Sequence, residues 1–193
     1  MAYHHGNLRA ALIAAAIDII DEEGLDGVSI RKVADRVGVS VAAPFRHFSS
    51  KADLISAVAE TAIEKLVNTI THTQSEGPED DALHQLELFS IGYIRWVRDN
   101  PTQYDLIGSR PIDEFKVSEK LFELYMWLRD TMFDLIVQAE RDGQLRPGCP
   151  HGRAVAARLS LRAAANAVAR ALYGLAGWRG SIPADAQGDR GLF

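Results

Sequence analysis

Between residues 27 and 51, positively charged side chains outnumber acidic ones. One acid, Asp35, lies in this segment. Its cations are Arg31, Lys32, Arg36, Arg46 and Lys51. This gives 5 − 1 = +4 in a chain of formal net charge −5, so the remainder carries −9. A basic segment on an acidic protein is typical of a local phosphate contact. It equally suits a solvated helical face, and on charge alone both interpretations stay open.

The spacing of capping residues predicts that these charges lie on two short helices. Ser29 is placed to cap a helix over residues 30–37, which Gly38 would end. Ser40 is placed to cap a second helix over residues 41–47. The free N–H groups at such capped helix N-termini suit phosphate.

A small residue and a flexible one allow the two helices to cross steeply, as entry into a major groove requires. Ala34 permits close crossing, and Gly38 tolerates the positive φ that the turn needs. The spacing Ala34–Gly38–Ser40 is more specific than any one of these residues. A small apolar underside is formed by Val33, Val37 and Val39.

The rest of the chain is also predicted to be helical, without strand-like alternation. Further helices are expected over residues 8–23, 51–73, 81–99, 102–107, 111–141 and 153–176. The helix from Lys51 would be capped by Ser50 and carry one apolar stripe: Leu54, Val58, Ala62, Leu66 and Ile70. The tail over residues 177–193 has no periodicity, and we expect it to be disordered.

Several classes of protein are disfavoured by the composition. The single cysteine, Cys149, excludes an intrachain disulfide and fits a reducing cytoplasm. The polar residues 3–7 predict no secretory signal, and no apolar run approaches 18 residues, so we expect no membrane partner. Because GxGxxG, P-loop, HExxH and GxSxG motifs are absent, we expect no catalytic residues, metal or cofactor.

The segment from Leu8 to Val58 resembles the TetR family of bacterial transcriptional regulators. The resemblance rests on an alanine-rich first helix, Gly24, Ser-Ile-Arg at 29–31, Gly-Val-Ser at 38–40 and Phe-Arg-His-Phe at 45–48 before Lys51. It implies an all-α fold with a three-helix DNA-binding domain over residues 1–53. A helical effector-binding and dimerisation domain would follow over residues 54–176.

By this resemblance the second short helix is the recognition helix, and serines and cations around it hold phosphates or sugars. The candidate DNA-binding residues are Ser29, Arg31, Ser40, Val41, Ala42, Ala43, Phe45, Arg46, His47 and Lys51. Two departures stand out: the family usually has tyrosine at position 45, and Pro44 disfavours helical geometry at Ala43. Val41, Ala42 and Ala43 suit a thymine methyl, whereas Arg46 is the long donor for a base edge or a phosphate.

The C-terminal two-thirds is rich in aromatic and small residues. The aromatic residues indicate an apolar or aromatic effector, although each of them would equally fill an ordinary core. The candidate effector residues are Phe89, Tyr93, Trp96, Tyr104, Phe122 and Met126. The resemblance implies a homodimer formed through the last two helices, whereas packing of their alanines within one subunit is the alternative.

These observations favour a ligand-responsive repressor that binds a pseudo-palindromic operator as a homodimer in the cytoplasm. Its partners would be double-stranded DNA, a second copy of the chain and a small effector. Two alternatives stay open: a protein-binding module of the same fold without specific DNA binding, and an all-helical enzyme, for which the sequence offers no motif.

Overall fold

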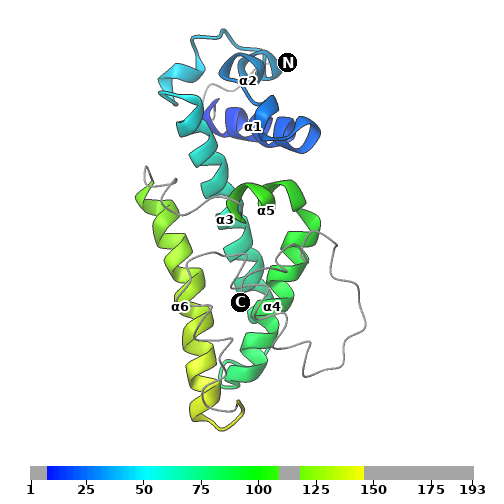
Figure 1. Ribbon diagram of the computed structural model, residues 1–193, viewed down its shortest axis with the longest axis vertical. Coiled ribbons are helices and arrows are strands. Elements are labelled where there is room, and N and C mark those ends of the chain that lie inside the picture. The colour runs from blue at the N-terminus through cyan, green and yellow to red at the C-terminus, as the bar shows by residue number, and fades with distance from the viewer. Residues whose placement is uncertain (1–7, 109–117, 146–193) are drawn as a thin grey trace, which may run out of the picture.

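A computed structural model describes residues 8–108 and 118–145 of the chain, and in these ranges all regular structure is helical. The helices are α1 (Leu8–Glu23), η2 (Leu25–Gly27), α2 (Ile30–Val37), η3 (Pro44–Arg46), α3 (Lys51–Gln74), α4 (Ala82–Asp99), α5 (Pro101–Gly108) and α6 (Glu119–Arg141). The predicted all-α class is therefore confirmed. Figure 1 shows α1, α2 and the start of α3 at one end of an elongated molecule.

We call residues 8–50 the head and the remaining described residues the body. In the head, α1 packs against α2, α3 and α5, which explains why its buried positions extend around most of the helix. Its apolar residues share one continuous core with Val28, Val33 and Phe48. The head is thus built around α1, which also joins it to the body.

The first helix of the body, α3, continues directly from the head. Ser50 caps it by accepting a hydrogen bond from the backbone N–H of Asp53 at 3.1 Å, as predicted. The predicted apolar stripe is fully buried, because α4 and α6 pack along it. The helix ends at Gln74, one residue beyond the predicted end.

Helices α3 and α4 pack closely where a glycine replaces a side chain. A Cβ atom on Gly92 would lie 2.9 Å from the Cα atom of Ile70. Asp81, predicted as the first residue of this helix, is its N-cap and accepts a hydrogen bond from the backbone N–H of His84 at 3.0 Å. Helices α4 and α5 are separated at Asn100, as the predicted helices over residues 81–99 and 102–107 require. Helix α5 begins at Pro101, one residue before its predicted start.

Helix α6 lies beside α3 and α4 along the length of the body (Figure 1). Ser118 caps it by accepting a hydrogen bond from the backbone N–H of Leu121 at 3.1 Å. It ends at Arg141 as predicted, whereas the expected stretch over residues 111–117 lies outside the described residues. The predicted last helix, Cys149 and the tail over residues 177–193 also lie outside them. Across residues 8–108 and 118–145, no helix has the length and apolar character needed to cross a membrane.

Candidate nucleic-acid interface

The first helix of the predicted motif, α2, has both of its predicted ends. Ser29 Oγ accepts a hydrogen bond from the backbone N–H of Lys32 at 3.2 Å. Gly38 ends the helix in the left-handed conformation, with φ 77° and ψ 33°. The backbone N–H of Val39 then bonds to the carbonyl of Ala34 at 3.0 Å. The tight turn that the spacing predicts at Gly38 is therefore confirmed, and Ala34 is fully buried.

The predicted second helix over residues 41–47 is wrong in its extent. A turn comes first, in which the carbonyl of Ser40 accepts from the N–H of Ala43 at 2.9 Å. The 3-10 helix η3 then covers only Pro44–Arg46. Proline has no N–H to bond the carbonyl of Ser40, so the first i→i−4 bond of an α-helix cannot form and a new helix begins at Pro44.

The predicted cap at Ser40 is also wrong. The side chain of Ser40 caps no helix, since the residue before η3 is Ala43. Ala43 adopts helical geometry, with φ −64° and ψ −44°, although a following proline disfavours it. The tight hydrogen bonds from Ala43 to Ser40 and from Phe48 to Pro44, both 2.9 Å, hold this conformation.

Two buried residues anchor the turn from beneath. Pro44 is buried, and Phe48 is only 2% exposed within the core of the head. The Arg9 guanidinium lies 5.6 Å from the centre of the Phe48 ring, a cation–π contact. Neither anchor was predicted from the sequence, although an apolar pair at i and i+4 is the pattern that could have revealed them. With Pro44 and Phe48 fixed, the residues between them face solvent.

Two of the five cations in the basic segment are paired with acids of α1. Arg36 donates two hydrogen bonds to Glu22, at 2.8 and 2.5 Å, and Lys32 bonds to Glu23. The hydrogen bond from Arg36 lowers the pKa of the Glu22 carboxyl. The charge of +4 counted along the sequence is therefore partly cancelled by residues outside the counted segment.

The other cations are more available. Arg46 makes no ion pair with any residue in the described ranges. Arg31 is 4.0 Å from Asp35 in a fully solvated pair of little strength. Lys51 Nζ donates to the carbonyl of Leu25 at 3.3 Å and stays exposed. These three cations are the ones left to meet an external anion.

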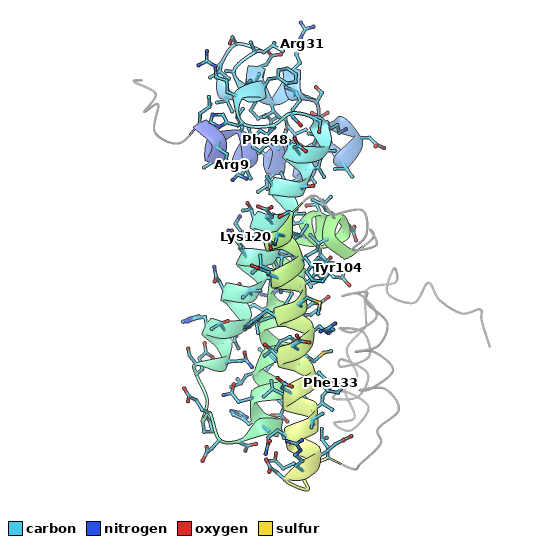
Figure 2. All side chains as sticks on the ribbon, turned by 90° about the vertical axis from the view of Figure 1, so that its left-hand side faces the viewer. Arg9, Arg31, Phe48, Tyr104, Lys120 and Phe133 are labelled. Atoms are coloured by element: carbon cyan, nitrogen blue, oxygen red, sulfur yellow. The ribbon has the colours of Figure 1, made fainter. Side chains whose placement is uncertain are left out.

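All ten candidate DNA-binding residues are exposed except Ala43, which is half-buried. They come from the start of α2, the turn with η3 and the start of α3. Figure 2 shows Arg31 at the outer end of the molecule, beyond Arg9 and Phe48. The chain thus brings these residues to one exposed end, while their individual roles toward DNA stay predictions.

The candidate effector residues of α4 and α5 lie within the molecule. Phe89, Tyr93 and Trp96 follow one face of α4 at i, i+4 and i+7 and belong to the apolar core. The ring of Tyr104 on α5 meets that of Tyr93 edge-on, with their centres 6.2 Å apart. These positions satisfy the core interpretation, and an effector role for them stays a prediction.

The two candidate effector residues of α6 differ from those of α4. Met126 is half-buried, whereas Phe122 is 52% exposed. Trp127 on the same helix is 37% exposed. An exposed phenyl ring points less to a pocket within the chain than to a contact with a further surface.

Polar contacts join the far helices to the head. Ser118 at the start of α6 donates to Glu60 on α3, and Arg9 on α1 lies 4.0 Å from the same carboxylate. On another side of α1, Thr102 of α5 donates to Asp21. Helix α5 therefore contacts α1 directly through Asp21, and the start of α6 shares the Glu60 carboxylate with Arg9 of α1.

A buried hydrogen bond ties α6 to α5. The Tyr125 hydroxyl donates to the carbonyl of Ile107 at 2.5 Å. Burial raises the pKa of this hydroxyl, so it stays a neutral donor. A shift of α6 would therefore also move α5.

These features define the class of the protein as a helix-turn-helix protein with a helical body. The family sequence model described as "Bacterial regulatory proteins, tetR family" matches residues 12–58, which contain the whole motif. Residues 12–58 are thus similar to the DNA-binding segment of the TetR family of transcriptional regulators.

Two relatives in sequence are consistent with this match. Tetracycline repressor protein class C of Escherichia coli is 36% identical over 73 residues, 38% of this chain and 31% of the repressor. An uncharacterized HTH-type transcriptional regulator of Mycobacterium bovis is 33% identical over 112 residues, 58% of this chain and 57% of that protein. The chain thus covers from about a third to little more than half of these relatives.

The fold extends beyond the matched segment. A solved structure of a protein with unknown function from Rhodococcus sp. RHA1 is similar with a TM-score of 0.69 at 25% identity. The similarity covers 96% of this chain and 91% of that one.

Proposed function

We propose that this chain is a ligand-responsive repressor that binds a pseudo-palindromic DNA operator as a homodimer. The observation that carries the proposal is the exposed turn of the head, held between two buried anchors and surrounded by available cations. A protruding element of this kind suits the major groove of DNA.

In the proposed complex, contacts to the DNA backbone supply most of the affinity. Arg31, Arg46 and Lys51 would meet phosphates, together with Ser29, Ser40 and His47. Because each neutralised phosphate releases a counterion, affinity should fall steeply as salt rises. Val41, Ala42, Ala43 and Phe45 would face the base edges.

The proposed dimer would place two heads on successive major grooves, about 34 Å apart. It would form through α6 and the predicted helix over residues 153–176. The exposed Phe122 and Trp127 support α6 as part of this contact, because large apolar groups in solvent favour association.

The proposed effector would bind the body among α4, α5 and α6. Support comes from two buried polar atoms, Trp96 Nε1 and Gln103 Oε1, which have no hydrogen-bond partner in the described part of the chain. Buried groups of this kind usually have partners, and a ligand would supply them. The contacts of α5 and α6 with Asp21 and Glu60 offer a route by which a bound effector changes the head.

A fluorescence-anisotropy titration tests the proposal. Purified protein is titrated into labelled DNA from its own upstream region at two salt concentrations, with random DNA as competitor. The expected result is binding that resists the competitor and weakens steeply with salt. Binding equal to that of random DNA would overturn specific DNA recognition and favour the protein-binding alternative.

Matched arginine variants localise the contact. Arg46→Ala should weaken DNA binding and reduce the salt slope by about 1, since one phosphate contact is lost. Arg98→Ala removes an exposed arginine of the body that pairs with Asp99, and it should leave binding unchanged. Equal effects of both substitutions would contradict the proposed interface.

A further inference from the structure

Two large apolar side chains of the head lie in solvent. Val41 is 43% exposed and Phe45 is 55% exposed. The other exposed large apolar residues in the described ranges, Ile91, Phe122 and Trp127, belong to α4 and α6. Val41 and Phe45 therefore mark a separate apolar feature at the outer end of the molecule, where the candidate DNA-binding residues gather.

Hydrogen bonds fix the backbone around these two residues. Consecutive turns are closed by bonds from Ala43 to Ser40 and from Phe48 to Pro44. Val41 lies in the turn before η3 and Phe45 lies within η3, and both side chains are exposed. The buried Pro44 and Phe48 occupy the inner side.

The chemistry of the pair limits what it can recognise. Neither a phenyl ring nor a valine side chain donates or accepts hydrogen bonds with the polar edges of guanine, adenine or cytosine. In the major groove, the C5 methyl group of thymine is the apolar feature of a base edge. Ala42, exposed between them, is too short to keep a methyl group away.

We propose that Val41 and Phe45 read thymine methyl groups, so that the operator is recognised by apolar contact more than by hydrogen bonds to bases. This inference rests on the proposed function and names what its DNA contact selects. Arg46, adjacent to Phe45, would then hold the backbone beside the methyl groups.

A protein partner is the other occupant that an apolar pair could serve. Stable protein interfaces bury about 1,200–2,000 Å² in total, far more than one valine and one phenylalanine provide. The pair is also surrounded by cations and short polar residues, which suit a phosphate-lined groove. The setting therefore favours DNA.

Uracil-substituted DNA provides the test. The upstream fragment is amplified once with dTTP and once with dUTP, which keeps every base pair and removes every thymine methyl. Burying one methyl group changes affinity by about fourfold. With contacts in two half-sites, the wild-type dimer should bind the uracil fragment about tenfold more weakly or worse, by competition anisotropy.

Variants separate a methyl contact from a change in DNA shape. Phe45→Ala should weaken binding to the thymine fragment and bring the ratio of the two affinities close to one. Val41→Ala should lower the ratio partway. Arg46→Ala should weaken binding to both fragments and leave the ratio unchanged. Because residues 41, 45 and 46 are exposed, thermal unfolding of each variant should match the wild type.

The failure of this inference is distinguishable from that of the proposed function. Specific, salt-sensitive binding with equal affinity for both fragments would overturn methyl readout and leave the regulator proposal standing. A thymine preference that persists in Phe45→Ala and Val41→Ala would assign it to DNA shape and overturn the role of these residues. Absence of specific binding to either fragment would overturn both.

Discussion

The head and the body differ in how far their candidate functional residues are exposed. In the head, the candidate functional residues are exposed, and several of their polar groups bond weakly or not at all within the described chain. In the body, the candidate effector residues of α4 lie in the core and already pack against other residues. The exposure of the candidate residues therefore supports a binding role in the head, whereas burial alone does not separate binding from core packing in the body.

The difference follows from how each region is stabilised. The head fixes a short turn through caps, a left-handed glycine and two buried anchors, which leaves the intervening side chains free. The body is held by apolar burial along α3, α4 and α6, and the same aromatic residues that could bind a ligand also fill that core. Four substitutions test this division, from the largest expected effect to the smallest.

Leu66→Ala should destabilise the protein most. Leu66 is fully buried on α3, and removing it loses transfer free energy and leaves a cavity. The expected loss is about 2–5 kcal/mol in the free energy of unfolding, measured by urea denaturation. Val41→Ala, the matched control in the head, should change stability by less than about 0.5 kcal/mol. Similar losses for both would break the division between the regions.

Gly38→Ala should strain the turn of the head. Gly38 has φ 77°, and a Cβ atom there would meet nothing within 4 Å, so the penalty is conformational and not steric. We expect a loss of about 1–2 kcal/mol, measured by the same urea transition. Gly38→Asn is the control, because asparagine tolerates the left-handed region better. If asparagine and alanine destabilise equally, backbone strain is not the cause.

Ser29→Ala should remove a helix cap, whereas Ser40→Ala should not. Ser29 Oγ accepts the backbone N–H of Lys32, and its loss should lower the free energy of unfolding by about 1 kcal/mol. The side chain of Ser40 caps no helix, so the second variant should stay within about 0.5 kcal/mol of the wild type. Thermal or urea unfolding distinguishes the two variants. Equal losses of stability would support the helix cap predicted at Ser40.

Asp53→Asn should produce the smallest effect, present at neutral pH and absent at low pH, where the wild-type carboxyl is also uncharged. The hydroxyl and the backbone N–H of Ser49 both donate to the Asp53 carboxylate and lower its pKa below the ordinary 3.8. The charged carboxylate therefore stabilises the folded state above pH 3.8, and this contribution is lost below that value as pH falls through the lowered pKa of the folded protein. Urea midpoints measured between pH 7 and pH 3 should fall less in the variant than in the wild type. An identical pH dependence would contradict the assignment.

The sequence predicted the head in most of its detail because its features are local. Ser29, Gly38 and Ser50 each act within four residues, so their spacing defines the helix ends. The error at residues 41–47 is also local: Pro44 was recognised as unfavourable to the helix, yet the restart at the proline depends on how Pro44 and Phe48 pack into the core.

Predictions that needed tertiary contacts were harder to make. The acids that neutralise Lys32 and Arg36 lie on α1, and only the crossing of α1 and α2 brings them together. In the body, helical periodicity predicted the buried stripe of α3 correctly. It could not separate a core phenylalanine such as Phe89 from an exposed one such as Phe122, because that depends on which helices pack against each face.

Helix α3 joins the two regions as a single rod. Its 24 residues span about 36 Å, and it begins at Lys51 beside the DNA-facing residues. Gly92 clamps its far half against α4. A tilt of about 5° around that contact would carry the near end, about 28 Å away, by about 2.5 Å, close to the length of one hydrogen bond. A small rotation of α3 would thus change the separation of the two heads in the proposed dimer. That separation would then no longer match the spacing of successive major grooves.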